Sequence, residues 1–208
     1  MKKLLSSVLL LATSFEISAQ TSTLKVAGTF GAQGTCNVSS TNFGNYDLGV
    51  VSTALVKNVR TPLSPISAIW TVDCSTVTSV TFSTSDAQRA SALTPATLTE
   101  FGLGPINTSG KVGLYTVNAT NPMVDGREAR FFTTAGPTIE GKTSALLAHT
   151  QRSGWASLAD VKTLAIGKQF KVNLDVAVTL ATEAEMSGPP QDGNPLNGNL
   201  TLTFKQGL

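Results

Sequence analysis

Apolar and polar residues alternate along several separate stretches of this chain, which is the pattern of strands that bury one face. The longest stretch, FKVNLDVAVTL, predicts a central strand over residues 169–181. Its apolar positions are Phe170, Val172, Leu174, Val176, Val178 and Leu180. Shorter alternating stretches predict strands over residues 45–51, 66–74, 78–84, 110–118 and 199–206. Apart from the strand at 110–118, residues 84–165 carry only short apolar runs, which predict a helical turn or two or packed loops.

The last of these predicted strands ends the chain. It follows a turn-rich passage, SGPPQDGNPLNG, whose prolines cannot donate hydrogen bonds to a sheet. Leu200, Leu202 and Phe204 then lie on one face of the strand. A sandwich of the immunoglobulin type has about seven strands, whereas roughly six are predicted here. A sheet that lacks a strand keeps an open apolar edge, and such an edge recruits a strand from another chain.

A further alternating stretch, TSTLKVAGTF, lies near the beginning of the chain. One of its faces carries Leu24, Val26, Gly28 and Phe30. A period of two does not identify the partner of such a strand. Residues 23–30 therefore form either an edge strand of this chain's own sheet or a strand that another molecule receives.

Residues 1–19 have the features of a cleaved secretion signal. Lys2 and Lys3 precede an apolar run over residues 4–12, and the small residues Ser18 and Ala19 precede Gln20. The apolar run is too short to span a bilayer, which disfavours the alternative of a retained anchor helix. We therefore predict an exported protein whose mature chain begins near Gln20.

The composition is typical of an all-β protein. Charged residues make up only 13% of the chain, glycines number 18, and threonine, valine and serine are abundant. Loss of the leader removes Lys2, Lys3 and Glu16, which lowers the net charge from +2 to +1. A charge this close to zero gives no attraction to nucleic acid or acidic lipid. The composition and the pattern of short strands between glycine and proline turns together predict a single all-β domain, a sandwich of the immunoglobulin type.

The two cysteines, Cys36 and Cys74, are predicted to form a disulfide, because an exported chain meets an oxidising compartment. The chain-entropy model gives such a bridge about 4 kcal/mol of stabilisation. A structural zinc site needs about four ligands, and His149 is the only histidine. The sequence therefore predicts neither a metal nor a cofactor.

No residue pattern predicts a catalytic site. No serine lies in a nucleophile motif that His149 would serve as a base. The carboxylates that a glycoside hydrolase would need are available only in turn-like sequence, where they are more often solvated. These carboxylates are Asp125, Glu128 and Glu140.

The two tryptophans have different predicted roles. Trp70 is in phase with Cys74, so it is expected in the core against the disulfide. Trp155 lies in SGWASL, where we expect a loop. Its ring is either a binding contact for a sugar or a protein, or a core anchor. The anchor is favoured because a tryptophan buries a large area.

Taken in order, these segments resemble the pilin subunits of bacterial chaperone-usher fimbriae. The resemblance rests on the alternating segment ahead of Cys36, on YDLGVV, on WTVDC with Cys74, and on the C-terminal GNLTLTF. The stretches EFGLG, GKVGLYT and SGWASL are similar to a less characterised, fimbrial-like branch of that family. The resemblance covers essentially the whole mature chain.

The resemblance implies a structural protein that travels through the periplasm to the cell surface and supports adhesion. Such subunits have an incomplete immunoglobulin-like fold that lacks the last strand. A periplasmic chaperone lends a strand to the open groove, and at the outer-membrane usher the N-terminal extension of the next subunit replaces it. Other fimbrial subunits and a host or surface receptor are further implied partners. The alternative is a stand-alone secreted module that binds carbohydrate or protein and supplies its own closing strand.

The resemblance also assigns roles to particular segments. Residues 20–34 would be the N-terminal donor-strand extension, and residues 35–208 the pilin-like domain. The donor strand would insert the face made of Leu24, Val26, Gly28 and Phe30. The groove would be bordered at the C-terminus by Leu200, Leu202 and Phe204. Family subunits usually carry an aromatic residue next to last, whereas Gly207 stands there in this chain. The middle region is also longer than in a typical major pilin, so a minor or tip subunit fits the sequence as well as a shaft subunit.

Overall fold

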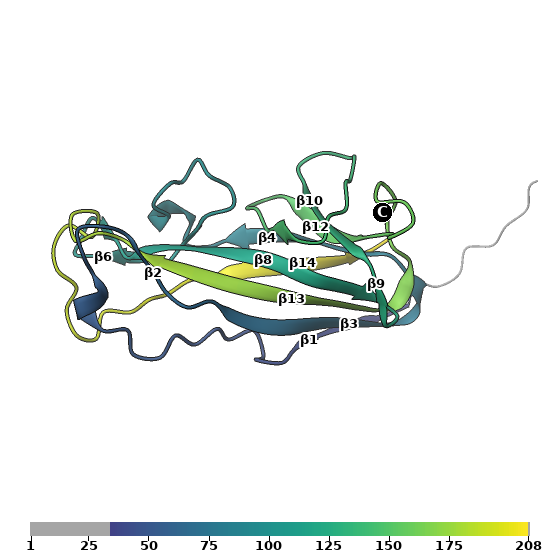
Figure 1. Cartoon of the computed structure of the whole chain (residues 1–208), viewed down its shortest axis with the longest axis horizontal. Coiled ribbons are helices and arrows are strands. Elements are labelled where there is room, and N and C mark those ends of the chain that lie inside the picture. The colour runs from purple at the N-terminus through teal and green to yellow at the C-terminus, as the bar shows by residue number, and fades with distance from the viewer. Residues whose placement is uncertain (1–33, 208) are drawn as a thin grey trace, which may run out of the picture. The chain divides into compact units, whose positions relative to one another are not determined.

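The computed structural model describes residues 34–207, which form an all-β sandwich of two antiparallel sheets (Figure 1). They belong to the second of the two units into which the chain divides, Gln33–Leu208. The larger sheet has the strand order β1-β3-β13-β8-β11, and the smaller sheet the order β10-β12-β4-β14. In this part of the chain, no helix has the length and apolar character needed to cross a membrane. The all-β prediction is confirmed.

Long strands at the centre of the larger sheet carry most of the fold. The larger sheet contains β1 (Cys36–Ser40), β3 (Ile66–Thr78), β13 (Gly167–Leu180), β8 (Gly113–Val124) and β11 (Ala145–Leu146). Short strands extend it, namely β2 (Thr61–Pro62), β5 (Phe101–Gly102) and β9 (Arg127–Glu128). The smaller sheet contains β10 (Arg130–Thr134), β12 (Arg152–Ala156), β4 (Val80–Asp86) and β14 (Leu200–Gln206). The remaining elements are the pair β6 (Pro105–Ile106) and β7 (Gly110–Lys111) and the 3-10 turns η1 (Thr53–Leu55) and η2 (Arg89–Ser91).

Strand β13 is the central strand that the sequence predicts over residues 169–181. It pairs with β3 on one side and with β8 on the other. Its alternating apolar side chains are all buried, with exposed fractions of 8% or less: Phe170, Val172, Leu174, Val176, Val178 and Leu180. The strands predicted over residues 66–74, 78–84, 110–118 and 199–206 also form, as β3, β4, β8 and β14.

The prediction of a strand over residues 45–51 is wrong. The carboxylate of Asp47 accepts a hydrogen bond from the backbone N–H of Gly49 at 2.8 Å, which closes a turn. Gly49 has a φ of 61°, a conformation that glycine adopts without steric cost. Residues 45–50 consequently follow the sheet edge without joining a ladder.

The expectation of loops or helical turns between residues 84 and 165 is also wrong in part. This region supplies β10 and β12, which pair with each other, and β12 pairs in turn with β4. The SGWASL stretch, expected as a loop, carries most of β12. Short apolar runs do not distinguish a buried strand from a packed loop, so no clear signal for these strands is present in the sequence.

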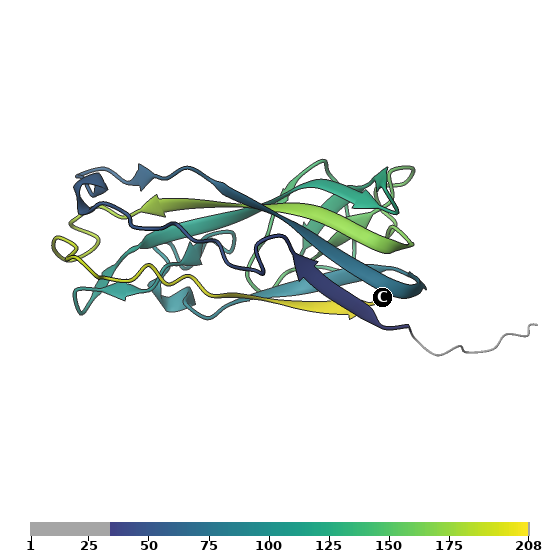
Figure 2. The ribbon, with the colours of Figure 1, turned by 90° about the horizontal axis from the view of Figure 1, so that it is seen from below.

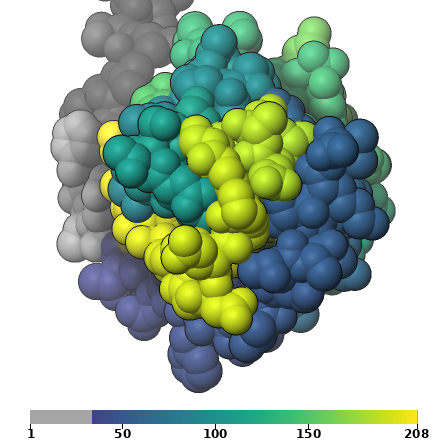
Figure 3. Space-filling view, turned by 90° about the vertical axis from the view of Figure 1, so that its left-hand side faces the viewer, coloured from purple at the N-terminus to yellow at the C-terminus, as the bar shows by residue number. Residues whose placement is uncertain are grey.

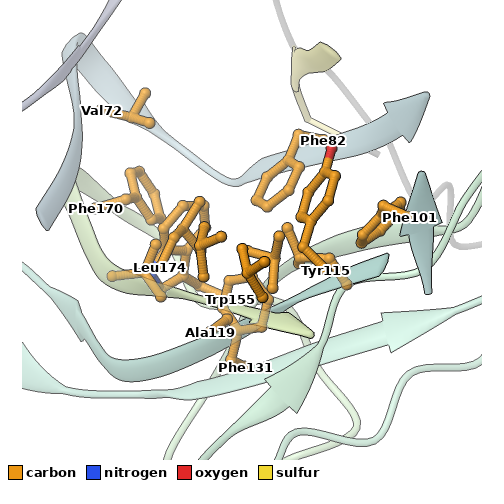
Figure 4. Packing of buried hydrophobic residues seen from close by; sticks show 14 of the residues in the cluster. Val72, Phe82, Phe101, Tyr115, Ala119, Phe131, Trp155, Phe170 and Leu174 are labelled. Atoms are coloured by element: carbon orange, nitrogen blue, oxygen red, sulfur yellow. The ribbon is translucent and has the colours of Figure 1, made fainter. Parts of the chain in front are cut away.

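Trp155 is at the centre of the core and not on the surface (Figure 4). Its side chain is 1% exposed, and its indole N–H donates to the carbonyl oxygen of Lys171 at 2.8 Å. The aromatic rings of Phe131, Phe170 and Phe82 surround it, with centroids 5.5, 5.4 and 6.2 Å away. The candidate role of Trp155 as a binding contact is therefore wrong, and the alternative of a core anchor is correct.

The predicted disulfide between Cys36 and Cys74 is present and joins β1 to β3. Trp70, on the same face of β3, packs against the core cluster that contains Cys74, but its side chain is only half buried. Trp70 is opposite Ser40, the last residue of β1, and its ring lies beside Gly44 in the irregular segment that follows. Its ring therefore borders an opening in the sandwich.

Removal of the disulfide by the double change Cys36→Ser and Cys74→Ser should lower the free energy of unfolding by about 2–5 kcal/mol. The reason is that β1 is the edge strand of the larger sheet and the bridge fixes its register on β3. Urea unfolding measures the change, with Ser39→Ala on the exposed face of β1 as the control. An unfolding midpoint equal to that of the control would contradict the expectation.

Candidate functional site: an open apolar cleft

A cleft runs along the sandwich between the edge of the larger sheet and the edge of the smaller one. Residues 44–53, which follow β1, form one wall, and residues 190–202, which lead into β14, form the other. Figure 2 shows these two segments side by side, the first in blue and the second in yellow. The cleft consists of two hollows with volumes of about 330 and 500 Å³.

The floor of the cleft is the core of the sandwich itself. The smaller hollow is floored by residues of β8 and β13 that also belong to the main apolar cluster. These residues are Val117, Leu174, Val176 and Val178. The larger hollow reaches Val112, Leu180 and Met186 of the same cluster. These floor residues are 8% exposed or less, so the partly exposed apolar surface of the cleft is on its walls.

The inward-facing side chains of the cleft walls are apolar but only half buried. On β14, Leu200, Leu202 and Phe204 alternate inward as the sequence predicts. On the opposite wall, Tyr46 and Leu48 pack against the same core. Leu200 and Leu202 line the cleft, whereas Phe204 stacks on Phe82 with ring centroids 4.9 Å apart. Half burial of inward-facing side chains is what an uncovered strip of core produces.

Neither wall has a full set of strand partners within residues 34–207. Strand β14 pairs with β4 on one side and with no described strand on the other. The opposite wall takes part in no ladder beyond β1. An edge with free backbone groups beside an apolar trough is the setting in which a polypeptide adds a strand.

Hydrogen bonds hold the irregular wall in place where no ladder does. The indole N–H of Trp70 donates to the Tyr46 hydroxyl at 2.9 Å, and that hydroxyl donates to the carbonyl oxygen of Leu174 at 3.2 Å. Burial raises the pKa of Tyr46, so the hydroxyl keeps its proton for the second bond. The sequence suggested no link between Tyr46 and Trp70, because only the fold brings them together.

The β14 wall approaches the floor most closely at Gly198. A Cβ atom at this position would lie 2.7 Å from the ring of Tyr115, which is closer than carbon atoms pack. The Tyr115 side chain is 6% exposed, and burial, together with the charge of Asp86, raises its pKa above the ordinary range for tyrosine. Gly198 thus lets the chain cross a buried aromatic ring before β14 begins.

An ion pair fixes the end of the larger hollow. Arg60 donates to Glu185 at 2.6 Å, and Glu185 also accepts the backbone N–H of Thr182 at 3.0 Å and the Thr182 hydroxyl at 3.1 Å. The hydrogen bond from Arg60, aided by those from Thr182, lowers the pKa of Glu185 to about 2. These contacts hold the turn that carries Met186 beneath the cleft.

The polar residues considered for catalysis lie apart from the cleft. His149 accepts the backbone N–H of Asp86 at 3.1 Å through Nδ1. Asp125 accepts the backbone N–H groups that follow Gly167, and Glu128 pairs with Arg130. Glu140 is exposed beside a shallow surface hollow. Within residues 34–207, no three histidine, cysteine, aspartate or glutamate side chains gather as metal ligands would.

The residues assigned to a donor strand from the sequence lie outside the described part of the chain. They are Leu24, Val26, Gly28 and Phe30.

Comparison with known proteins adds no assignment: no protein-family model matches this chain, and no curated protein matches it significantly. The candidate function must therefore be argued from the cleft.

Replacement of Glu185 by glutamine should make the fold less sensitive to acid. A carboxylate whose pKa falls on folding stabilises the folded state above its ordinary pKa of 4.5, and this stabilisation is lost as the pH falls through about 2. Between pH 6 and pH 2, the melting temperature of the wild type should therefore fall further than that of Glu185→Gln. The exposed neighbour Glu183→Gln is the control, and parallel curves for all three proteins would contradict the assignment.

Proposed function

We propose that this protein is a structural subunit of a bacterial surface fimbria whose cleft receives a strand from another subunit. The observation that carries the proposal is the uncovered strip of core between residues 44–53 and β14. In this proposal the sandwich is an immunoglobulin-like fold without its last strand. Assembly of this kind needs no cofactor and no chemical reaction.

An added strand would gain stability from two sources along the cleft. Its backbone would pair with the free edge of β14, which is 7 residues long. Its alternate side chains would enter the apolar trough, where each buried leucine, valine or phenylalanine contributes about 1.5–3 kcal/mol. Both gains require an extended peptide with an apolar residue at every second position.

The chain itself carries such a peptide near its beginning. Leu24, Val26 and Phe30 alternate with polar and small residues, and Gly28 takes up little space between them. The donor segment and the cleft are different surfaces, so their association is head-to-tail and extends from copy to copy without closing. The partners in this proposal are other fimbrial subunits, a periplasmic chaperone that covers the cleft before assembly, and the outer-membrane usher.

Deletion of residues 20–30 tests the donor half of the proposal. The mature chain, produced with a fimbrial chaperone, should form polymers that withstand denaturant and appear as a ladder on a gel. The deletion variant should remain a chaperone-bound subunit with an intact fold by circular dichroism. Polymers of the deletion variant as long as those of the mature chain would contradict the proposal.

The cleft half is tested with a synthetic peptide of residues 20–33 and the deletion variant. Leu48→Arg places a charge in the cleft wall and should weaken peptide binding by at least about tenfold, or 1.4 kcal/mol. Phe43→Arg is the matched control, because Phe43 is 99% exposed. Equal affinity of the two variants for the peptide would count against the cleft as its binding site.

A further inference from the structure

The described sandwich has two ends with different segments. At one end, here called the termini end, the backbone N–H of Ser75 donates to the carbonyl oxygen of Thr35 at 2.9 Å. The backbone N–H of Gly207 donates to the carbonyl oxygen of Ser79 at 2.8 Å at the same end. The strands β13 and β3 also meet there through Gly167, which is opposite Thr78. Both ends of the described chain are therefore on this side, at the right of Figure 1.

The opposite end, here called the loop end, contains residues 47–60, 104–112 and 181–196. The backbone N–H of Lys111 donates to the carbonyl oxygen of Glu185 at 3.0 Å. The backbone N–H of Glu183 donates to the carbonyl oxygen of Lys57 at 3.4 Å. Figure 3 faces this end, with residues 181–196 in yellow-green beside residues 47–60 in blue. The larger hollow of the cleft opens here.

The termini end carries an exposed apolar patch, here called the termini patch, of Val77, Leu158 and Ile166. Their exposed fractions are 62%, 48% and 68%. Ile166 and Val77 are each next to a member of the pair Gly167 and Thr78, and Leu158 borders with Ile166 a surface hollow of about 630 Å³. Single exposed apolar side chains are ordinary, whereas a group of them beside a hollow marks an interaction surface.

The loop end also exposes two apolar side chains, Val50 and Val59, which are together called the loop patch here. Val50 is 102% exposed and Val59 68% exposed. Val50 also belongs to the rim of the larger hollow. An apolar surface thus lies directly beside the mouth of the cleft.

The length of the linker after the proposed donor segment determines which subunit lies against the termini end of the donor subunit. Five residues, 31–35, separate Phe30 from Cys36, and an extended linker of that length spans at most about 20 Å. Cys36 begins β1 at the termini end. A subunit that holds Phe30 in its cleft must therefore lie close to this end of the donor subunit.

The direction of the donor strand in the cleft determines which end of the acceptor subunit faces the donor subunit. Strand β14 runs toward the termini end, because Gln206 is opposite Val80. All strands of the smaller sheet are antiparallel, and antiparallel pairing is the more stable arrangement. A donor strand antiparallel to β14 would put Phe30, its last apolar residue, near Leu200 and would leave the acceptor at the loop end.

We propose that the termini patch docks on the loop patch of a second copy of this chain, the copy that accepts the donor strand. This inference rests on the proposed function. The contact adds an apolar attachment beside the inserted strand and restricts bending at the junction. The occupant is a second copy because its loop end presents an apolar surface at the place that the linker can reach.

Cross-linking of the assembled mature chain tests this contact. The variant Ile166→Cys with Val50→Cys is polymerised and treated with a short bis-maleimide, which leaves the native disulfide intact. We expect covalent links between the loop end of one copy and the termini end of the next, identified by mass spectrometry of the linked peptides. The control pair is Ile166→Cys with Ile69→Cys, because Ile69 is 44% exposed in the middle of β3, away from both ends.

The outcomes separate this inference from the proposed function. Polymers linked through residues 166 and 50, and not through residues 166 and 69, support the docking. Polymers without links between 166 and 50, or with links between two copies of residue 166, overturn the docking and leave strand exchange in place. Failure of the mature chain to polymerise at all overturns both proposals.

A second variant measures the strength of the contact. Ile166→Ser should speed dissociation of the polymer in denaturant by about tenfold relative to Ile69→Ser, because only the first removes buried apolar surface from the junction. Equal dissociation rates of the two variants would overturn the docking as well.

Discussion

Burial of the apolar strip between residues 44–53 and β14 is the requirement on which the rest of this molecule depends. Strand β13 presents its inward side chains along its whole length, and Leu174, Val176 and Val178 form the buried floor of the cleft. The apolar surface left half exposed is on the cleft walls, at Leu48, Leu200 and Leu202. Uncovered apolar surface is costly in water, so an extended peptide that fills the cleft would stabilise the fold as well as join it to its source. In this account one interaction, the filling of the cleft by a strand, both stabilises the fold and assembles the polymer.

The remainder of the sandwich is built to keep this strip open without collapse. The disulfide between Cys36 and Cys74 fixes β1 on β3, and the hydrogen bonds through Tyr46 hold the irregular wall that follows. On the far side, the aromatic cluster around Trp155 closes the core between the two sheets. A rigid, closed side thus supports an open one, which is the arrangement that a receptor for a single strand needs.

The sequence predicted the parts of this fold that depend on local alternation. Strands β13 and β14 and the disulfide follow from side-chain period and compartment, and all are present. The strands β10 and β12 were missed, because short apolar runs are compatible with strand, turn or loop. Trp155 is the central ring, which was the favoured alternative, whereas Trp70 is only half buried and borders the cleft. Burial at that level depends on which strands become neighbours, and alternation alone carries no such information.

The cleft shows the same limit of sequence reasoning. Alternation identified Leu200 and Leu202 as inward-facing, and the structure places both along the opening. It also suggested a strand over residues 45–51, where the turn at Asp47 and Gly49 leaves an unpaired wall. Whether an inward-facing side chain has a partner across from it depends on long-range topology.

Amide hydrogen exchange tests the central claim most directly. The chain without residues 20–30 is compared with the assembled mature chain, and exchange is followed in β14 and β13. The account predicts that assembly slows exchange most at alternate amides of residues 200–206, those that face the cleft, and slows β13 only as far as the whole fold is stabilised. Equal exchange of β14 in the two states would contradict it, because the free edge would then have gained no strand.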